Sequence, residues 1–142
     1  MTFPLRNLSA SALLALASLP LAALASPAPD GASAYIISPA NGETVTSPVK
    51  VRFGLAGMGV APAGVEQAHT GHHHLLIDVE ELPAPDQPIP ADDHHRHFGG
   101  GQTEVTVDLP PGQHTLQLLL GDHQHIPHSP PVASEVVTVT VE

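Results

Sequence analysis

The stretch Gly71-His72-His73-His74-Leu75-Leu76-Ile77-Asp78 places three consecutive histidines directly before an apolar run. A short apolar run between a glycine and an aspartate is typical of a buried β-strand, and we predict one over residues 74–81. Side chains alternate between the two faces of a strand. His72 and His74 therefore share one face, while His73 shares the other with the apolar residues that follow. The stretch predicts imidazoles at the edge of a hydrophobic core.

The rest of the chain carries the pattern of short β-strands. Apolar and polar residues alternate in several segments, proline- and glycine-rich connections separate them, and no 3.6-residue period follows the N-terminal region. This pattern predicts an all-β domain, a single immunoglobulin-like antiparallel β-sandwich, with a small β-barrel as the alternative. The strands are expected at residues 35–37, 49–55, 105–109, 116–120 and 137–141.

Two connections are long for a small β-domain. Residues 82–101 are rich in proline, histidine and glycine, and residues 121–131 are rich in histidine and proline. Long connections without regular structure are uncommon in compact domains, and binding residues concentrate in loops. These two loops are therefore the places where we expect function.

The N-terminal region has the features of a secretory signal. Arg6 precedes an apolar run over residues 10–25, which ends in the small-x-small pattern Ala23-Leu24-Ala25. We expect a signal peptide over residues 1–25, a flexible linker over 26–33 and the folded domain over 34–142. The run is too short to span a membrane, and a buried N-terminal helix is the alternative. The expected location is the periplasm or the exterior of the cell.

The charge and cysteine content limit the possible partners. The chain has 14 acidic residues against 4 lysines and arginines and a net charge of −10 with neutral histidines, and it has no cysteine. Such a protein is a poor partner for nucleic acid or anionic membranes, but it attracts cations. Without cysteine, disulfides and thiolate metal sites are excluded. Any metal must be held by imidazole, carboxylate, thioether or backbone oxygen.

Histidine is the residue that stands out, with 11 in the chain. Three clusters each contain a His-x-His pair. Alternate residues on a strand lie about 6.6 Å apart on one face, so two imidazoles can converge on one metal at about 2.0–2.1 Å per nitrogen. A solvated strand start or loop is the competing interpretation of each pair. The six predicted metal ligands are His72, His74, His95, His97, His123 and His125.

Four further residues are weaker ligand candidates. His73 has the parity of the apolar residues after it, so it is also explained as a histidine at the core edge. His94 and His128 flank the paired histidines in the two long loops. Met58 offers a thioether, which favours Cu(I), or caps the core from its loop. Nearby aspartates, namely Asp78, Asp92, Asp93 and Asp122, are candidates to orient the imidazoles.

The histidines indicate a transition metal, and copper first, because Cu(II) binds nitrogen sites most tightly of the divalent series. The expected metal is copper, as Cu(II) or Cu(I), and zinc is the alternative. We expect binding, buffering or delivery of the metal, with a periplasmic donor or acceptor protein as a partner, and affinity that falls below about pH 6.5. A copper- or zinc-dependent oxidoreductase of superoxide-dismutase-like architecture is the second hypothesis. A structural or adhesion-type sandwich without stoichiometric metal is the third.

From Gly57 to its end, the chain resembles a bacterial secreted family known only as a domain of unknown function, number 4399. The resemblance covers most of the expected domain. It implies an exported single domain and brings no established activity, so the metal hypothesis depends on the residues themselves. The motifs that carry the resemblance are Met58-Gly59-Val60 with Pro62-Ala63-Gly64, residues 71–78, His97-Phe98-Gly99-Gly100-Gly101-Gln102-Thr103-Glu104, Pro111-Gly112 with His114-Thr115-Leu116, and Gly121-Asp122 with His128.

Overall fold

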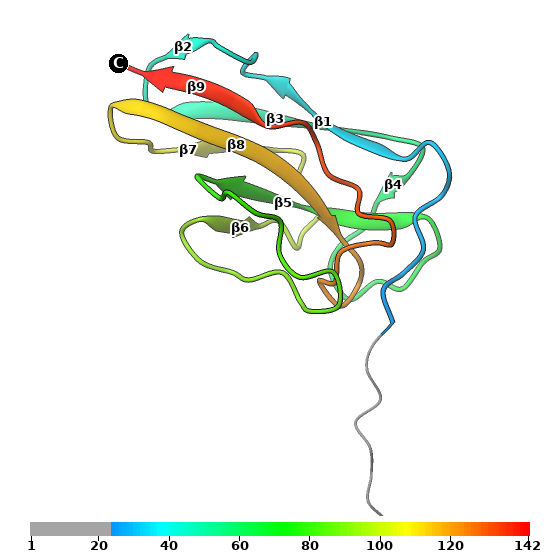
Figure 1. Cartoon of the computed structure of the whole chain (residues 1–142). Helices are drawn as coiled ribbons and strands as arrows, with labels where there is room; N and C mark the ends of the chain where they lie inside the picture. Colours follow the sequence, from blue (N-terminus) through cyan, green and yellow to red (C-terminus); the bar gives the residue numbers. More distant parts are fainter. Residues whose placement is uncertain (1–23) are drawn as a thin grey trace, which may run out of the picture.

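The computed structural model describes residues 24–142, so nearly all of the predicted signal peptide lies outside the described residues. The described part contains nine strands and no helix, arranged as two facing sheets (Figure 1). The predicted all-β sandwich is therefore confirmed. Neither sheet closes into a barrel, which excludes the alternative. No helix within residues 24–142 has the length and apolar character that a membrane span requires.

The first sheet has three antiparallel strands in the order β1-β3-β7. These strands are β1 (Ser33–Ser38), β3 (Val49–Ala56) and β7 (Glu104–Val107). The side chains of β3 alternate between buried and exposed at Val49, Lys50, Val51 and Arg52, as a strand with one solvated face requires. The buried apolar side chains of β3, such as Val49 and Val51, thus point toward the second sheet.

The second sheet has the order β2-β9-β8-β5-β4, and β6 also pairs with β5. β8 (Gly112–Gly121) runs antiparallel to both β9 (Val137–Val141) and β5 (Thr70–Ile77). The free edge of β5 is shared by two short strands, β4 (Gly59–Val60) along its start and β6 (His95–His97) along its end. β2 (Thr44–Val45) lies parallel to β9 at the other edge.

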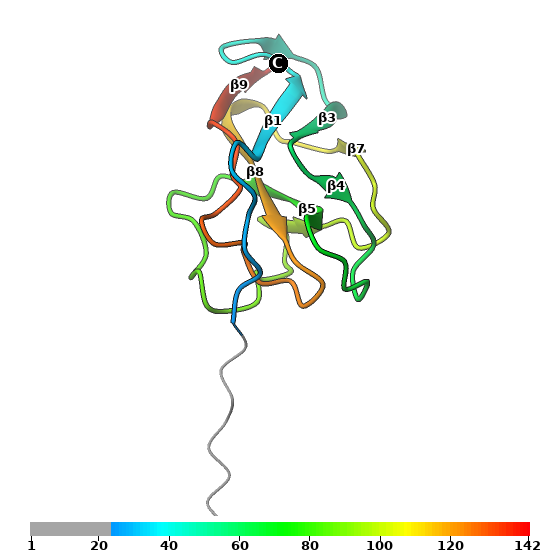
Figure 2. The same cartoon turned by 90° about the vertical axis from the view of Figure 1, so that its right-hand side faces the viewer.

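The order of the strands is that of an immunoglobulin-like sandwich. β1, β3 and β7 take the places of strands A, B and E in one sheet, while β5, β8 and β9 take those of C, F and G in the other. Figure 2 shows these two groups of strands as two layers. The core between the layers consists of buried apolar side chains from both sheets, including Val51, Phe53, Leu75, Leu118 and Val139.

A second, smaller apolar cluster lies on the outer face of the second sheet. Leu76 from β5 and Leu119 from β8 pack there against Ile89, which belongs to the long loop after β5. The sheet is therefore covered on both faces at this point, which explains the unbroken apolar runs in the middle of both strands. The same loop and the loop after β8 lie on one side of these strands (Figure 1). This covered outer face is where His72 and His74 lie.

Some boundaries differ from the predicted ones. β5 begins at Thr70 and ends at Ile77, because Asp78 has a φ of 56° and leaves the strand conformation. β2, β4 and β6 were not predicted, since strands of two or three residues show too little alternation to be recognised. The expected linker is attached to the domain along part of its length, with the Ala28 N–H donating to the Ser129 carbonyl at 3.0 Å.

Candidate metal centre

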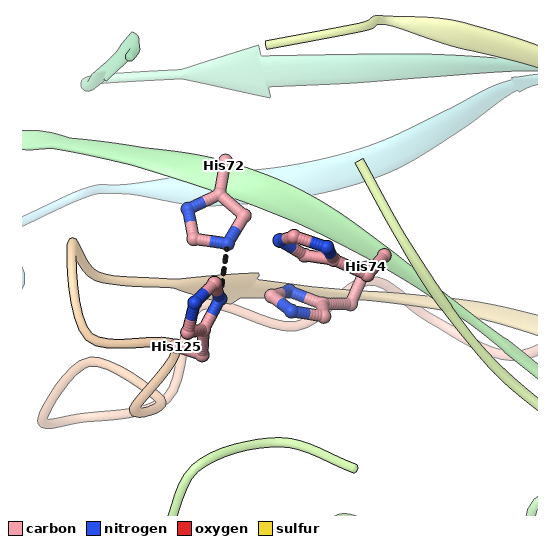
Figure 3. A group of neighbouring side chains, drawn as sticks. His72, His74 and His125 are labelled. Carbon is pink, nitrogen blue, oxygen red and sulfur yellow. Dashed lines mark hydrogen bonds between the residues drawn. The ribbon is translucent and has the colours of Figure 1, made fainter. Parts of the chain in front are cut away.

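Four histidines from three segments of the chain form one group. Each offers a ring nitrogen, and these four nitrogens lie within 4.8 Å of one another. Figure 3 shows the rings of His72, His74 and His125 turned toward a common point. Ring centroids are separated by 4.7 Å (His97 to His125) to 6.2 Å (His74 to His125). The group is the candidate metal centre, and its members are His72, His74, His97 and His125.

Strand β5 supplies two of the four imidazoles by its alternation. His72 and His74 share the outer face with Leu76, and both are almost completely buried. Their ring centroids are 4.8 Å apart. The pairing of β5 with β8 fixes the register, with His72 opposite Gly121 and His74 opposite Leu119. The His-x-His pair predicted from the sequence is thus placed on one face by ordinary strand geometry.

The third imidazole comes from the edge strand β6. His97 lies directly opposite His74 in the antiparallel pairing, and their ring centroids are 5.1 Å apart. A tight turn before β6 is held by Asp92, whose carboxylate accepts the backbone N–H groups of His94 and His95 at 2.8 Å each. The Ile77 N–H also donates to the His94 carbonyl at 2.8 Å. These bonds dock the long loop against β5 and bring His97 to the group.

The fourth imidazole comes from a tight turn after β8. The Asp122 carboxylate accepts the backbone N–H groups of Gln124 at 2.9 Å and Ile126 at 3.0 Å. His125 has a φ of 66°, a left-handed backbone conformation that is uncommon for a residue other than glycine. Its carbonyl accepts the N–H of Ile89 at 2.8 Å, so the two long loops are also bonded to each other. The turn is thus held by Asp122 from within and by the long loop after β5 from outside.

Two glycines leave room for the rings. A Cβ atom at Gly121 would lie 2.7 Å from Cε1 of His74, and one at Gly99 would lie 2.5 Å from Cε1 of His97. Both distances are shorter than van der Waals contact permits. A side chain at either position would displace the imidazole beside it, so the absence of a side chain there is part of the site.

The nitrogen positions fit a metal ion. Tetrahedral coordination at about 2.0–2.1 Å per nitrogen requires ligand nitrogens about 3.4 Å apart. Nε2 of His72 and Nδ1 of His125 are already 3.1 Å apart (Figure 3). Within the described residues, Nδ1 of His72 and Nδ1 of His74 are buried without a hydrogen-bond partner. Buried polar atoms are nearly always paired, so an unpaired nitrogen on each of these rings is unusual. One imidazole cannot give both of its nitrogens to one ion, so Nδ1 of His72 does not count as a ligand atom when Nε2 of that ring lies in the group.

The electrostatics keep the buried rings neutral. Burial, and after it the neighbouring imidazoles, lowers the pKa of His72 to about 4 and that of His74 to about 3. Burial and then the charge of His125 also lower the pKa of His97. A neutral imidazole is the form that binds a metal. Near neutral pH, protons therefore do not compete for His72 and His74.

The group can be reached from the surface. A pocket of about 180 Å³ opens beside three of the histidines and is otherwise lined by the proline-rich loop. His97 is exposed and His125 is half-buried, in contrast to the two histidines of β5. The lining residues are His74, Pro88, Ile89, Ala91, His97 and His125.

Two of the six predicted ligands lie outside the group. Nδ1 of His95 is 2.9 Å from a carboxylate oxygen of Asp92, and His95 lies opposite Leu76, one pair further along β5 than His74. His123 lines a different cavity with Asp122 and His128. We expected His123 and His125 on one face of a strand continuing past Gly121, but β8 ends at Gly121 and the chain turns. In a turn, residues two apart no longer share a face.

The four weaker candidates also lie elsewhere. His73 points into the core, with its ring centroid 5.2 Å from that of Phe53. Nδ1 of His94 is 2.8 Å from the Ile77 carbonyl oxygen. His128 is buried, with its Nε2 3.1 Å from the Thr70 carbonyl oxygen. Met58 packs against the core between the sheets, which leaves an all-nitrogen group.

The aspartates act on the backbone or on other histidines. Asp92 and Asp122 hold the turns before His97 and around His125, as described above. Asp78 bonds Nδ1 of His114 at 2.7 Å, at the other end of β5. No carboxylate in residues 24–142 forms a hydrogen bond with the rings of the four-histidine group. The roles of Gly99 and Gly121 were not predicted, although each lies near a histidine pair in the sequence.

Comparison with known proteins identifies one family. The model of the family described as "Domain of unknown function (DUF4399)" matches residues 51–142, which is more than half of the chain and includes all four histidines of the group. No curated protein and no solved structure matches the chain.

Proposed function

We propose that this chain, which belongs to the DUF4399 family, binds one transition-metal ion through His72, His74, His97 and His125. One observation carries the proposal: four ring nitrogens from three separate segments lie within 4.8 Å of one another. Two of the rings, those of His72 and His74, are almost completely buried, which is costly for polar groups unless something binds them. A solvated cluster of surface histidines would not explain that burial.

Copper is the proposed metal. Four neutral imidazole nitrogens are a donor set for Cu(II), Ni(II) or Zn(II), and Cu(II) has the highest affinity in this series. Cu(I) prefers thiolate and thioether sulfur, and Met58 packs in the core rather than in the group. The expected order of affinity is therefore Cu(II) above Zn(II), with zinc as the alternative occupant.

The proposed role is buffering or delivery of the metal in the periplasm or outside the cell. The predicted signal peptide supports this location, and the net charge of −10 favours the approach of cations. His97 is exposed at the pocket, so a donor or acceptor protein can reach one ligand directly, while His72 and His74 stay buried. Such a graded exposure suits ligand exchange with a partner.

The test is a metal analysis of protein purified without a tag, followed by competition titration with Cu(II) and Zn(II). We expect one Cu(II) per chain in the wild type and loss of this binding in His72→Ala/His74→Ala. The single variant His97→Ala should weaken binding without disturbing the core, since this residue is exposed. The matched control is His95→Ala/His123→Ala, which removes two histidines outside the group and should leave the affinity unchanged.

Unchanged stoichiometry and affinity in both His97→Ala and the folded His72→Ala/His74→Ala protein would show that the group is not the metal site. Absence of stoichiometric metal in the wild type would instead favour a structural or adhesion-type sandwich. Equal losses in the control variant would indicate nonspecific binding by dispersed histidines.

An oxidoreductase is the second candidate, because the pocket of about 180 Å³ beside His74, His97 and His125 gives a small molecule access to a bound ion. A catalytic metal keeps a coordination position open, whereas a closed four-nitrogen site does not. Superoxide dismutation by the copper-loaded protein, lost in His97→Ala, would support the enzyme. Activity no greater than that of free copper would support the carrier.

A further inference from the structure

Asp122 is a buried carboxylate without a cation. It is only 1% exposed, and one of its oxygens, Oδ1, accepts the backbone N–H groups of Gln124 and Ile126. The ion pairs within residues 24–142 do not include Asp122. A buried charge is costly unless it is paired or fully hydrogen-bonded. A positive group at this carboxylate would therefore stabilise the fold.

The other oxygen of Asp122 is bonded to a residue near the beginning of the described chain. Oδ2 accepts the hydroxyl of Ser26 at 2.9 Å and the backbone N–H of Ser26 at 3.3 Å. Ser26 is also held from its other side, because its carbonyl accepts the N–H of Ser129 at 3.0 Å. Its backbone nitrogen is thus fixed against a buried carboxylate 96 positions away in the chain.

Ser26 is the residue predicted to become the first of the mature chain. Leu24, two positions earlier, is 88% exposed, whereas Ala25 and Ser26 are half-buried. As an amide, the nitrogen of Ser26 is neutral and carries one hydrogen. As a free α-amino group it would carry a positive charge and three hydrogens, beside a cavity of about 240 Å³ that Ser26 and Asp122 both line.

We propose that Asp122 is the binding site for the chain's own processed N-terminus. Cleavage between Ala25 and Ser26 supplies an α-ammonium group, which replaces the amide N–H at Oδ2 and neutralises the buried carboxylate. A charge-assisted hydrogen bond of this kind is stronger than the neutral bond it replaces. Removal of the signal peptide then also stabilises the fold, through the ion pair between the new N-terminus and Asp122.

The pairing also affects the candidate metal centre, and this part rests on the proposed function. Asp122 closes the turn that carries His125, since its carbonyl accepts the His125 N–H at 2.9 Å. His125 is held there at a φ of 66°. A firmly anchored Asp122 keeps this conformation, so the processed protein should bind metal more tightly than an unprocessed one.

The test is a cycle of four metal-free proteins over residues 26–142. The N-terminus is either the free amine of Ser26, produced by a protease that leaves no extra residue, or the same chain acetylated at Ser26. Each form is made with Asp122 and with Asp122→Asn, and the folding equilibrium constant is measured by urea unfolding. With Asp122, acetylation should lower the constant about tenfold, and with Asp122→Asn it should have no effect. The same loss in both backgrounds would overturn the proposal.

Amide hydrogen exchange keeps the test valid if Asp122→Asn does not fold. In the Asp122 protein, acetylation should speed exchange of the Gln124 and Ile126 amides about tenfold relative to amides in β9. Unchanged exchange at these two positions would also overturn the proposal.

Copper titration of the free and acetylated proteins then separates the two proposals. If acetylation lowers the folding constant but neither protein binds copper, the proposal for the N-terminal site is supported and the proposed metal-binding function is refuted. Coupling together with tighter copper binding by the free form supports both.

Discussion

Metal binding should weaken far less on acidification than four ordinary histidines would allow. A proton competes with the metal for each ring nitrogen, and a histidine of ordinary pKa, about 6.5, costs about tenfold in affinity between about pH 7.5 and about pH 5.5. Four such ligands would lose about 10,000-fold. The structure changes this number because two of the ligands are buried.

The pKa of His72 is lowered to about 4 and that of His74 to about 3, with burial as the largest cause. Both rings remain unprotonated at about pH 5.5, so neither contributes to the loss. Only two ligands are left for which protons compete, so the expected total loss is about 100-fold or less. The affinity expected from sequence to fall below about pH 6.5 should instead persist well below it.

The assay is competition for Cu(II) against a chelator whose own protonation constants are known, at the two pH values. Circular dichroism at each pH verifies that the protein stays folded. A corrected loss near 10,000-fold would refute the assignment of His72 and His74 as buried ligands, and a loss below about 100-fold would support it.

Three further predictions concern single residues. Gly121→Ala places a Cβ 2.7 Å from Cε1 of His74, so copper affinity should fall about 10- to 100-fold in competition titration, whereas Gly59→Ala, whose Cβ would meet only Thr70 at 3.6 Å, should not change it; equal affinities would contradict the packing argument. His73→Leu tests the buried core imidazole, whose pKa is lowered to about 4 by burial and whose two nitrogens have no partner in the described residues. The folded pKa of His73 is below its unfolded one, so its contribution to stability is complete above about pH 6.5 and falls by about 3 kcal/mol toward about pH 4. In urea unfolding, the stability of the variant should therefore fall by about 3 kcal/mol less than that of the wild type over this range, and parallel pH profiles would contradict this. The hydrogen bond to Asp78 raises the pKa of His114, so this pair stabilises the fold below about pH 6.5 and the stabilisation is lost as pH rises through the raised pKa. Asp78→Asn, which keeps a residue suited to the φ of 56°, should therefore destabilise the protein more at about pH 6 than at about pH 9, and a difference independent of pH would exclude the ion pair.

The fold class and two of the four histidines of the group follow from local patterns in the sequence. Alternation of apolar and polar residues predicts the sandwich because a strand exposes its faces with period two. The same rule separates His72 and His74 from His73, and the structure places the first two on the outer face and the third in the core. These conclusions need only local geometry, which a short stretch of sequence contains.

The other two histidines join the group through contacts that appear only in the folded protein. His97 rather than His95 faces the group because β6 pairs with β5 in a register that sets His97 opposite His74. His125 rather than His123 faces it because Asp122 ends the strand and closes a turn. The first choice depends on hydrogen bonds between β5 and β6, and the second also depends on the bond from the Ile89 N–H to the His125 carbonyl, which joins the two long loops. The spacing of residues within one segment carries no information about such bonds, and for that reason three equivalent His-x-His pairs became one pair and two single ligands.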